Sequence, residues 1–501
     1  MVLTLFFLTG RCVTGKSRIP SSCQPFSCPN EDVAVRSQPD GLTNRVAGGS
    51  SLSSPRRRQE PRRQCIPEQE ARNEDSQARV RAFSSRSVCR KSLDSRWSHT
   101  VYSGAMTWRS PVRNSFLSFS LPLIGNEEID EVVEALKSGW LTSGPRTKQF
   151  EQDFREAVRA PAALALNSCT AGLHVALKVL NIGPGDEVIT TPMTFAASVN
   201  VIEHVGATPV LVDVEPDTLN LQPDAVEQAI TNNTKAIIAV HYAGHPVELN
   251  ALRAIAEQYQ LHLIEDAAHA VGASFEGQPI GSGSNLTAFS FYATKNLTTG
   301  EGGMLTGAAD LLDHARVVSL HGMNREAWSR YSAGGKWAYD IVEPGFKYNM
   351  TDIQAAIGLQ QLKRFERMQD RRREIVETYN AAFGQHAAFL TPTTRSHVTN
   401  AWHLYVLRLR SSELSIGRDQ FIEEMTARNI GTSVHFIPIH MHSFYRNKYN
   451  YAPDDFPVAH AAFQNMLSLP LSPSMSDQDV ADVIDAVLDI RSAYGRRRAA
   501  A

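Results

Sequence analysis

Two residues in this chain, a lysine and an aspartate, have the side chains and the settings needed for chemistry on a bound aldehyde. Lys295 stands in Ser290-Phe-Tyr-Ala-Thr-Lys-Asn-Leu-Thr-Thr-Gly-Glu-Gly-Gly303, a turn rich in Gly and Thr. Asp266 follows the apolar run Leu261–Ile264. A lysine amine forms an imine with an aldehyde, and a carboxylate at a strand end can keep a pyridine nitrogen protonated. This pair is the minimum equipment for holding pyridoxal phosphate. Taken singly, the lysine can be a solvated side chain and the aspartate a cap or ion-pair partner.

Other residues near this pair fit a flat, phosphorylated ring. Thr170 and Ala171 lie in Asn167-Ser-Cys-Thr-Ala-Gly172, which follows an expected strand and opens an expected helix. Free N–H groups at a helix start favour a phosphate. His269 can touch a ring hydroxyl, and Phe195, just after a strand end, can stack on the ring. Each also has a plainer interpretation, as a helix cap, a structural histidine or ordinary core.

Two later segments add candidates. Asn349, in Lys347-Tyr-Asn-Met-Thr-Asp352, can donate to a phosphate. It can do so from a neighbouring subunit, because twofold dimers often build sites at their interface. His435, in Ser433-Val-His-Phe-Ile-Pro438, can bind a carboxylate of an amino donor, and the alternative of a strand histidine has equal weight.

The elements that must position these residues alternate between short apolar strands and helices. The expected strands are 163–166, 187–190, 208–213, 235–241, 261–264, 287–291 and 303–305. The expected helices are 126–139, 148–158, 170–180, 195–205, 224–230 and 248–259. This alternation predicts an α/β fold with a mainly parallel sheet covered by helices on both faces. Ligands in such sheets lie beyond the carboxyl ends of the strands, where Thr170, Asp266, His269 and 290–295 fall.

A long connecting helix is expected at 352–380, followed by a smaller α/β unit. Its expected strands are 401–409 and 431–435, and its expected helices are 419–428 and 476–490. We therefore predict a cofactor-binding large domain at 116–365 and a small C-terminal domain at 366–495. Residues 1–115 are rich in Arg and Ser without an apolar period, which predicts a disordered N-terminal extension.

Composition limits the other functions. The formal net charge of -2 over 501 residues gives no electrostatic reason to expect nucleic acid as a partner. No run of about twenty apolar residues occurs, so no membrane span is predicted. Five of the six cysteines precede residue 90, and only Cys169 lies where folding is expected. Their spacing matches no zinc pattern, so no metal site is expected, and a reducing, cytoplasmic location fits.

The region from about Leu121 to Ile490 resembles the DegT group of nucleotide-sugar aminotransferases, which are fold type I pyridoxal phosphate enzymes. The resemblance rests on motifs in the order and spacing of that family. They are Gly139-Trp-Leu-Thr-Ser-Gly-Pro145, Ser168-Cys-Thr-Ala-Gly172, Glu265-Asp-Ala-Ala-His-Ala270, Phe291-Tyr-Ala-Thr-Lys-Asn296, Gly300-Glu-Gly-Gly303 and Tyr348-Asn-Met-Thr-Asp-Ile-Gln354. Within the group, His241-Tyr-Ala-Gly244 and Ala401-Trp-His-Leu404 are most similar to members that aminate a 4-keto position, such as those like UDP-4-amino-4-deoxy-L-arabinose aminotransferase.

The resemblance implies a reaction and a set of roles. An amino group would pass from L-glutamate, leaving 2-oxoglutarate, to a 4-keto nucleotide sugar, with Lys295 as the catalytic Schiff-base lysine and proton shuttle. The implied cofactor-binding residues are Thr170, Ala171, Phe195, Asp266, His269, Ser290, Lys295 and Asn349. Asn349 would reach the phosphate from the other subunit of a homodimer. The implied substrate-binding residues are His435, Tyr292 and Trp140. Phe195 stands where close relatives carry tryptophan, and Tyr292 stands where some carry histidine.

Two other functions stay open at this point. One is a 3-keto-sugar aminotransferase of the same family. The other is a non-catalytic regulatory member, which the basic N-terminal segment alone favours. A third branch, the sugar dehydratases, replaces the lysine with histidine, and Lys295 argues against it.

Overall fold

A computed structural model describes residues 113–324 and 339–496. Residues 1–112 lie outside the described part, so the predicted disordered extension stays a prediction. Within the described residues, no helix is both long enough and apolar enough to pass through a membrane.

The main sheet has seven strands in the order β1-β9-β8-β5-β4-β2-β3. Only β9 runs against its two neighbours, and the remaining pairs are parallel. The predicted, mainly parallel sheet is therefore confirmed. The strands are β1 (Ala162–Leu166), β2 (Glu187–Thr190), β3 (Thr208–Leu211), β4 (Thr234–Val240), β5 (His262–Asp266), β8 (Leu286–Ser290) and β9 (Gly303–Gly307).

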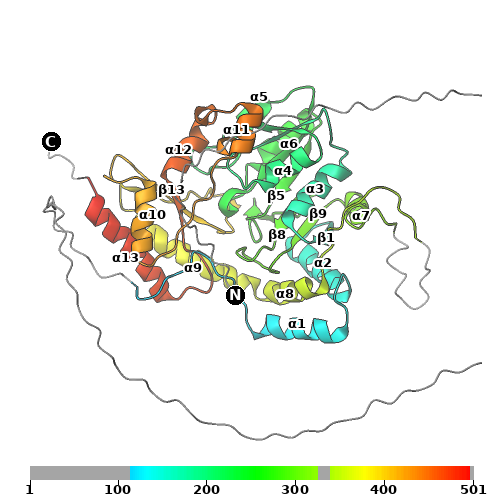
Figure 1. Ribbon diagram of the computed structural model, residues 1–501, viewed down its shortest axis with the longest axis horizontal. Coiled ribbons are helices and arrows are strands. Elements are labelled where there is room, and N and C mark those ends of the chain that lie inside the picture. The colour runs from blue at the N-terminus through cyan, green and yellow to red at the C-terminus, as the bar shows by residue number, and fades with distance from the viewer. Residues whose placement is uncertain (1–112, 325–338, 497–501) are drawn as a thin grey trace, which may run out of the picture. The chain divides into compact units, whose positions relative to one another are not determined.

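Helices cover both faces of this sheet (Figure 1). Successive strand residues point to opposite faces. In β4, Ile237 accordingly packs in one core with Phe150 and Leu252, while Ile238 packs in the other with Leu173 and Leu312. A sheet that is covered on both faces buries most strand positions, which favours apolar residues and explains the short apolar runs in the sequence. The covering helices are α2 (Pro145–Val158), α3 (Cys169–Val179), α4 (Ala197–His204), α5 (Pro223–Gln228), α6 (Leu249–Gln258) and α7 (Ala309–Val318).

The helix expected at 126–139 forms as α1 (Asn126–Ser138). Gly125 is its N-cap residue, and the N–H of Gly125 donates to the Glu128 carboxylate at 2.7 Å. Gly139 ends the helix at φ 78°, as expected of a glycine in the left-handed region. The apolar stripe of α1 stays exposed to solvent at Ile129, Val133 and Leu136.

The single connecting helix expected at 352–380 is in fact two helices, α8 (Asp352–Lys363) and α9 (Phe365–Phe383). The break falls at Arg364, whose guanidinium bonds the Glu128 carboxylate at 2.5 Å and the carbonyl of Leu123 at 3.2 Å. These contacts fix α8 against the start of α1. Phe365 then buries its ring in the main core.

A second, antiparallel sheet lies in the C-terminal part of the chain. Its strands are β10 (Phe389–Leu390), β12 (Tyr405–Leu409) and β13 (Met466–Leu469), with β12 in the centre. The sheet packs in one hydrophobic core with α9, α10 (Arg418–Ala427) and α13 (Asp477–Tyr494). Within this core the ring of Tyr379 on α9 contacts that of Tyr405 on β12. The predicted domain limits at 116–365 and 366–495 stay a prediction.

Two expected strands of this part differ in the structure. The strand expected at 401–409 begins only at Tyr405, and residues 401–404 form an irregular loop. The prediction of a strand at 431–435 is wrong, because this segment forms only one bridge, between Ser433 and Ser468. The N–H of Gly431 instead donates to the carbonyl of Leu117, so the N-terminal segment takes the place of a sheet neighbour.

Short elements complete the fold. A small sheet joins β6 (Ser274–Phe275), β7 (Gln278–Pro279) and β11 (Val398–Thr399). The remaining helical segments are η1 (Tyr242–Gly244), η3 (Ile439–Met441), α11 (Ser443–Tyr449), η4 (Pro453–Asp455) and α12 (Pro457–Asn465).

Candidate active site

The predicted cluster forms at the carboxyl edge of the main sheet. Asp266 and Ser290 are the last residues of the neighbouring parallel strands β5 and β8. Lys295 lies in the loop that leaves β8 and returns as β9, and its backbone N–H donates to the carbonyl of Tyr292 at 2.9 Å. The sequence therefore placed the lysine and the aspartate at the correct edge.

Asp266 is a buried carboxylate, 4% exposed, that is held by neutral donors. Its oxygens accept from the Ser198 hydroxyl at 2.7 Å and from the N–H of Ala268 at 3.1 Å. The Cys169 thiol lies 3.9 Å from the same carboxylate. Among the ion pairs of the described residues, none involves Asp266. A buried charge of this kind is costly until a cation meets it.

Lys295 carries an amine whose basicity is reduced. Burial lowers its pKa from 10.5 to about 8, and the nearby Cys169 and Asp266 oppose that shift. The lowering follows from desolvation, because a buried ammonium loses its hydration. A larger share of the amine is therefore uncharged near neutral pH, and only an uncharged amine can attack a carbonyl.

Three histidines surround the lysine. His403 places Nε2 at 3.4 Å from the Lys295 amine, and its ring lies 4.3 Å from that of His269, centre to centre. His269 accepts at Nδ1 from the N–H of Ala243, at 3.2 Å. Burial, and then the positive charge of Lys295, hold the pKa of His269 well below its usual range. The neutral ring therefore carries its proton at Nε2 and is a donor there.

His435 is the third histidine, and it comes from the C-terminal part of the chain. Its Nδ1 lies 2.9 Å from the Ser468 hydroxyl, and its ring stacks on Phe119. Burial, followed by the charge of Lys295, lowers the pKa of His435 to about 4. His435 is consequently neutral at pH 7.

The start of α3 lies beside the lysine loop. Ser168 is the N-cap residue, and its hydroxyl accepts from the N–H of Ala171 at 3.1 Å. Thr170 lies in the first turn of this helix and is partly exposed. Gly303 brings the lysine loop close, since a Cβ on it would stand 2.5 Å from the backbone nitrogen of Cys169. Thus the helix start expected to face a phosphate sits against the base of the Lys295 loop.

The aromatic candidates are found at the surface. Phe195 follows β2 and is 66% exposed, with its ring centre 6.2 Å from that of Phe436. Tyr292 and Trp140 are also exposed. Tyr292 belongs to the same turn as Lys295, whereas no contact found in the described residues joins Trp140 to the cluster.

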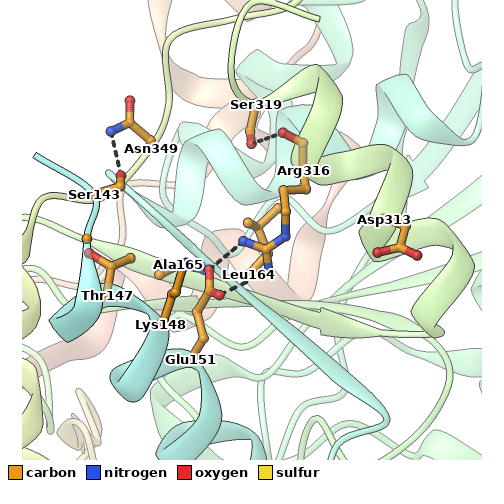
Figure 2. Close-up of a pocket in the computed structure, with 11 residues that line it drawn as sticks. Ser143, Thr147, Lys148, Glu151, Leu164, Ala165, Asp313, Arg316, Ser319 and Asn349 are labelled. Atoms are coloured by element: carbon orange, nitrogen blue, oxygen red, sulfur yellow. Dashed lines mark hydrogen bonds and ion pairs between the residues drawn. The ribbon is translucent and has the colours of Figure 1, made fainter. Parts of the chain in front are cut away.

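Asn349 lies elsewhere, at a pocket of about 310 Å³ that Figure 2 shows. Its amide donates to the Ser143 hydroxyl at 2.8 Å. The pocket also holds the ion pair between Arg316 and Glu151, at 3.0 Å. Lys295, Asp266 and His269 are absent from its lining. Within one chain the structure therefore does not bring Asn349 to the lysine.

The family is decided by the sequence match over this whole region. Residues 122–488 match the model of the DegT/DnrJ/EryC1/StrS aminotransferase family. The chain belongs to that family. Its cofactor is accordingly pyridoxal phosphate, and its fold is that of the fold type I enzymes.

Two relatives are similar to this chain along almost their entire length. The chain is 52% identical to the spore coat polysaccharide biosynthesis protein SpsC of Bacillus subtilis over 380 residues, which cover 75% of this chain and 98% of SpsC. It is also 52% identical over 382 residues to the uncharacterized protein MJ1066 of Methanocaldococcus jannaschii, covering 76% of this chain and 99% of that one.

Solved structures agree with this assignment. The putative sugar aminotransferase Spr1654 from Streptococcus pneumoniae, in its PMP form, matches with a TM-score of 0.71 and 37% identity. The match covers 75% of this chain and 99% of Spr1654. Helicobacter pylori PseC, an aminotransferase involved in the biosynthesis of pseudoaminic acid, matches with a TM-score of 0.70 and 28% identity, over 76% of this chain and all of PseC.

The residues present fit the family's cofactor. A protonated pyridine nitrogen is the cation that the buried Asp266 carboxylate lacks, and the amine of Lys295 is suited to bond an aldehyde. Sequence reasoning missed Ser198 and His403 as members of this cluster. Ser198 was expected inside a helix and His403 inside a strand. Neither position carries a sequence signal for a binding site, so their proximity to Asp266 and Lys295 could be found only from the structure.

Proposed function

We propose that the protein is a homodimeric aminotransferase that moves an amino group from L-glutamate to the 4-keto position of a nucleotide sugar. The observation that carries the reaction is the buried Asp266 carboxylate, for which the described residues provide no ion pair, next to a lysine whose pKa is lowered to about 8. The sugar substrate is supported by SpsC, Spr1654 and PseC, whose names describe polysaccharide, sugar and pseudoaminic acid chemistry.

The chain's own residues divide the work around the cofactor. When bound, pyridoxal phosphate supplies an aldehyde that takes up the amino group and a ring that accepts electrons. Lys295 would carry at Nζ the proton that leaves the α-carbon of the amino donor. Asp266 keeps the ring nitrogen protonated, with Ser198 and the N–H of Ala268 holding its oxygens in place. His269, whose Nδ1 accepts from the N–H of Ala243, would donate from Nε2 to the ring hydroxyl.

The phosphate and the ring face have their own binding residues. Ser290, Thr170 and the N–H groups at the start of α3 bind the phosphate, because a helix start carries partial positive charge. Ala171 has no polar side chain, and its small size lets the phosphate approach this turn. Phe195, exposed after β2, would stack on one face of the ring.

Substrates enter past the exposed residues of the site. The neutral His435 binds a carboxylate of glutamate by hydrogen bonding, which needs no charged imidazole. Tyr292 and Trp140 line the path of the sugar. Cys169 is buried as a free thiol, which agrees with a reducing, cytoplasmic location.

A second copy of the chain would complete the site. The apolar residues Ile129, Val133 and Leu136 on α1 are exposed, and burying such a stripe favours association. Asn349 lines the pocket of Figure 2, whose lining does not include Lys295, and its amide donates to the Ser143 hydroxyl. Serving the phosphate of the partner would require this amide to exchange its present partner for the phosphate.

Glutamate alone tests the reaction. Purified protein loaded with pyridoxal phosphate is mixed with L-glutamate, and the absorbance should convert from the pyridoxal to the pyridoxamine form while 2-oxoglutarate appears. A panel of 3-keto and 4-keto UDP- and dTDP-sugars follows, with the position of the new amine determined by NMR. No conversion with glutamate contradicts the donor, and an amine at C3 supports the 3-keto alternative.

Hybrid dimers test the shared site. Lys295→Ala and Asn349→Ala proteins are each expected to be impaired, but a mixed dimer contains one site with both native residues. After subunits exchange at random, activity should rise towards about a quarter of wild type, because half of the dimers are hybrids and each hybrid has one native site of two. If Asn349 served its own chain, every site in the hybrid would carry a defect and no activity would return.

A further inference from the structure

The loop at 400–404 brings a histidine to the lysine by an unusual path. It is pinned on η1, since the N–H groups of Ala401 and His403 donate to the carbonyls of Gly244 and Ala243 at 2.9 and 3.1 Å. Trp402 adopts a left-handed backbone at φ 49°, which turns the chain between them. His403 is thereby buried and directed at the Lys295 amine.

The proton position on His403 follows from its neighbours. The Asn296 amide nitrogen lies 2.6 Å from the carbonyl of Ala401, which can only accept, so the nitrogen must face that carbonyl. The Gln369 amide nitrogen faces the same carbonyl at 2.5 Å, and its oxygen lies 3.2 Å from the Asn296 nitrogen. The Asn296 oxygen is left to face Nδ1 of His403 at 3.1 Å.

His403 must then donate from Nδ1, and a neutral ring keeps a lone pair at Nε2. Burial, followed by the charges of Lys295, His269, Arg372 and His435, holds the pKa of His403 well below its usual range. Cys169 and Asp266 are the further titratable groups facing the amine. Within the described residues, the Lys295 amine is the one hydrogen-bond partner found for Nε2. His269, beside it, has the opposite tautomer and cannot accept at Nε2.

We propose that His403 is a positioning residue that accepts a hydrogen bond at Nε2 from the free amine of Lys295, with Asn296 fixing the tautomer that makes this possible. The amine is free whenever it is not bonded to the cofactor. The contact with His403 then holds the amine in the same buried cluster as Asp266. The inference rests on Lys295 being the catalytic lysine, but it concerns the amine itself and needs neither donor nor sugar.

Titration of the amine in the full-length apo-protein tests the proposal. Lys295 is labelled with trace acetic anhydride between pH 6 and 11 and quantified by mass spectrometry, with the exposed Lys363 as reference in the same digest. Wild type should reach half of its maximal rate near pH 8. An acceptor stabilises the ammonium, so His403→Phe should move this midpoint down by about one pH unit, which is a tenfold change.

A conservative variant separates positioning from packing. His403→Gln keeps an acceptor oxygen near Nε2 and should restore the midpoint, while His262→Phe, at an exposed histidine, should leave it unchanged. A folded His403→Phe protein with the wild-type midpoint overturns the proposal. So does an equal shift in the Phe and Gln variants, which would indicate a packing effect.

Asn296 provides an independent check. Asn296→Ala should shift the midpoint in the wild-type background but add nothing in the His403→Phe background, because it acts through the imidazole. If the midpoint shifts of the two single variants add fully in the double variant, Asn296 does not act through His403. If these variants fail to fold, wild-type protein with ¹⁵N-histidine still decides: His403 should show Nδ1–H and His269 Nε2–H, and Nε2–H at His403 refutes the proposal. None of these readouts depends on glutamate turnover, so they fail separately from the proposed function.

Discussion

Asp266 and Asp352 are both buried carboxylates at the edge of a helix or strand, and they are satisfied in different ways. Asp352 is fully buried and accepts four hydrogen bonds from the start of α2, namely from the N–H groups of Gly144, Arg146 and Thr147 and from the Thr147 hydroxyl. Asp266 accepts from one hydroxyl and one N–H, with a thiol farther away.

The difference separates a carboxylate that holds the fold from one that is ready for a ligand. Asp352 joins α8 to the positive end of α2, and every donor it meets is part of the protein. Within the described residues, Asp266 forms no ion pair, and it lies beside an amine of lowered pKa. Unpaired charge combined with shifted acidity is typical of functional sites. The comparison gives four predictions.

The largest effect is expected at the lysine. Lys295→Ala should reduce transamination by roughly 10³-fold or more, because both the covalent bond to the cofactor and the proton carrier are lost. Product formation measures it, and Lys363→Ala, at an exposed lysine, is the control. Borohydride reduction followed by peptide mapping should label Lys295 in the wild type. A label on another lysine would move the catalytic role elsewhere.

Exchanging each aspartate for asparagine should separate the two roles. Asp266→Asn would remove the carboxylate that pairs with the ring nitrogen of the bound cofactor, a loss of about 3–5 kcal/mol, and should weaken cofactor binding by roughly 10²–10⁴-fold. Asp352→Asn should instead lower the free energy of unfolding by about 1–3 kcal/mol, because buried N–H groups lose their acceptor. Cofactor titration and urea denaturation measure the two. Equal loss of cofactor affinity in both variants would erase the distinction.

Stability of the apo-protein should depend on pH through Lys295. Its folded pKa of about 8 lies below the unfolded value of 10.5, so the unfolded state binds more protons between these values. The free energy of unfolding should therefore rise with pH from about 8 to 10.5, by up to about 3 kcal/mol relative to Lys295→Met. Urea denaturation of both proteins at several pH values measures it. Parallel pH curves for the two proteins would show that the buried amine is not destabilised.

The smallest effects should come from single hydroxyl donors. Ser198→Ala and Thr147→Val each remove one 2.7 Å hydrogen bond to an aspartate. Each loss is worth about 1 kcal/mol. In Ser198→Ala it should appear as weaker cofactor binding, and in Thr147→Val as lower stability with unchanged cofactor binding. The reverse outcome would mean that Asp266 serves the fold and Asp352 the ligand.

The sequence predicted the parts of the fold that depend on local pattern. Apolar runs such as 187–190 and 235–241 became strands because a covered sheet needs apolar residues on both faces. Asp266 and Lys295 were placed together because the ends of parallel strands share an edge. Both conclusions need only periodicity and topology.

Other features depend on partners far along the chain. The break at Arg364 carries no Pro or Gly signal, and it follows from contacts with Glu128 and Leu123. Residues 431–435 were expected to form a strand, but the N–H of Gly431 bonds the carbonyl of Leu117, and only Ser433 pairs with Ser468. His403 reached the site only because residues 401–404 form a loop pinned on η1 rather than a strand.

The reversed direction of β9 has a consequence for the loop that carries Lys295. Ser290 and Gly303 are paired neighbours across β8 and β9, so the segment between them starts and finishes at one point of the sheet. A parallel β9 would require a crossover of a dozen or more residues to the far end before the chain could return. Because β8 and β9 form an antiparallel hairpin, no such crossover is needed. A loop whose two ends are held together has fewer conformations than a free segment of the same length. The whole segment 291–302 could therefore be exchanged between relatives, because its two ends attach at paired positions of β8 and β9.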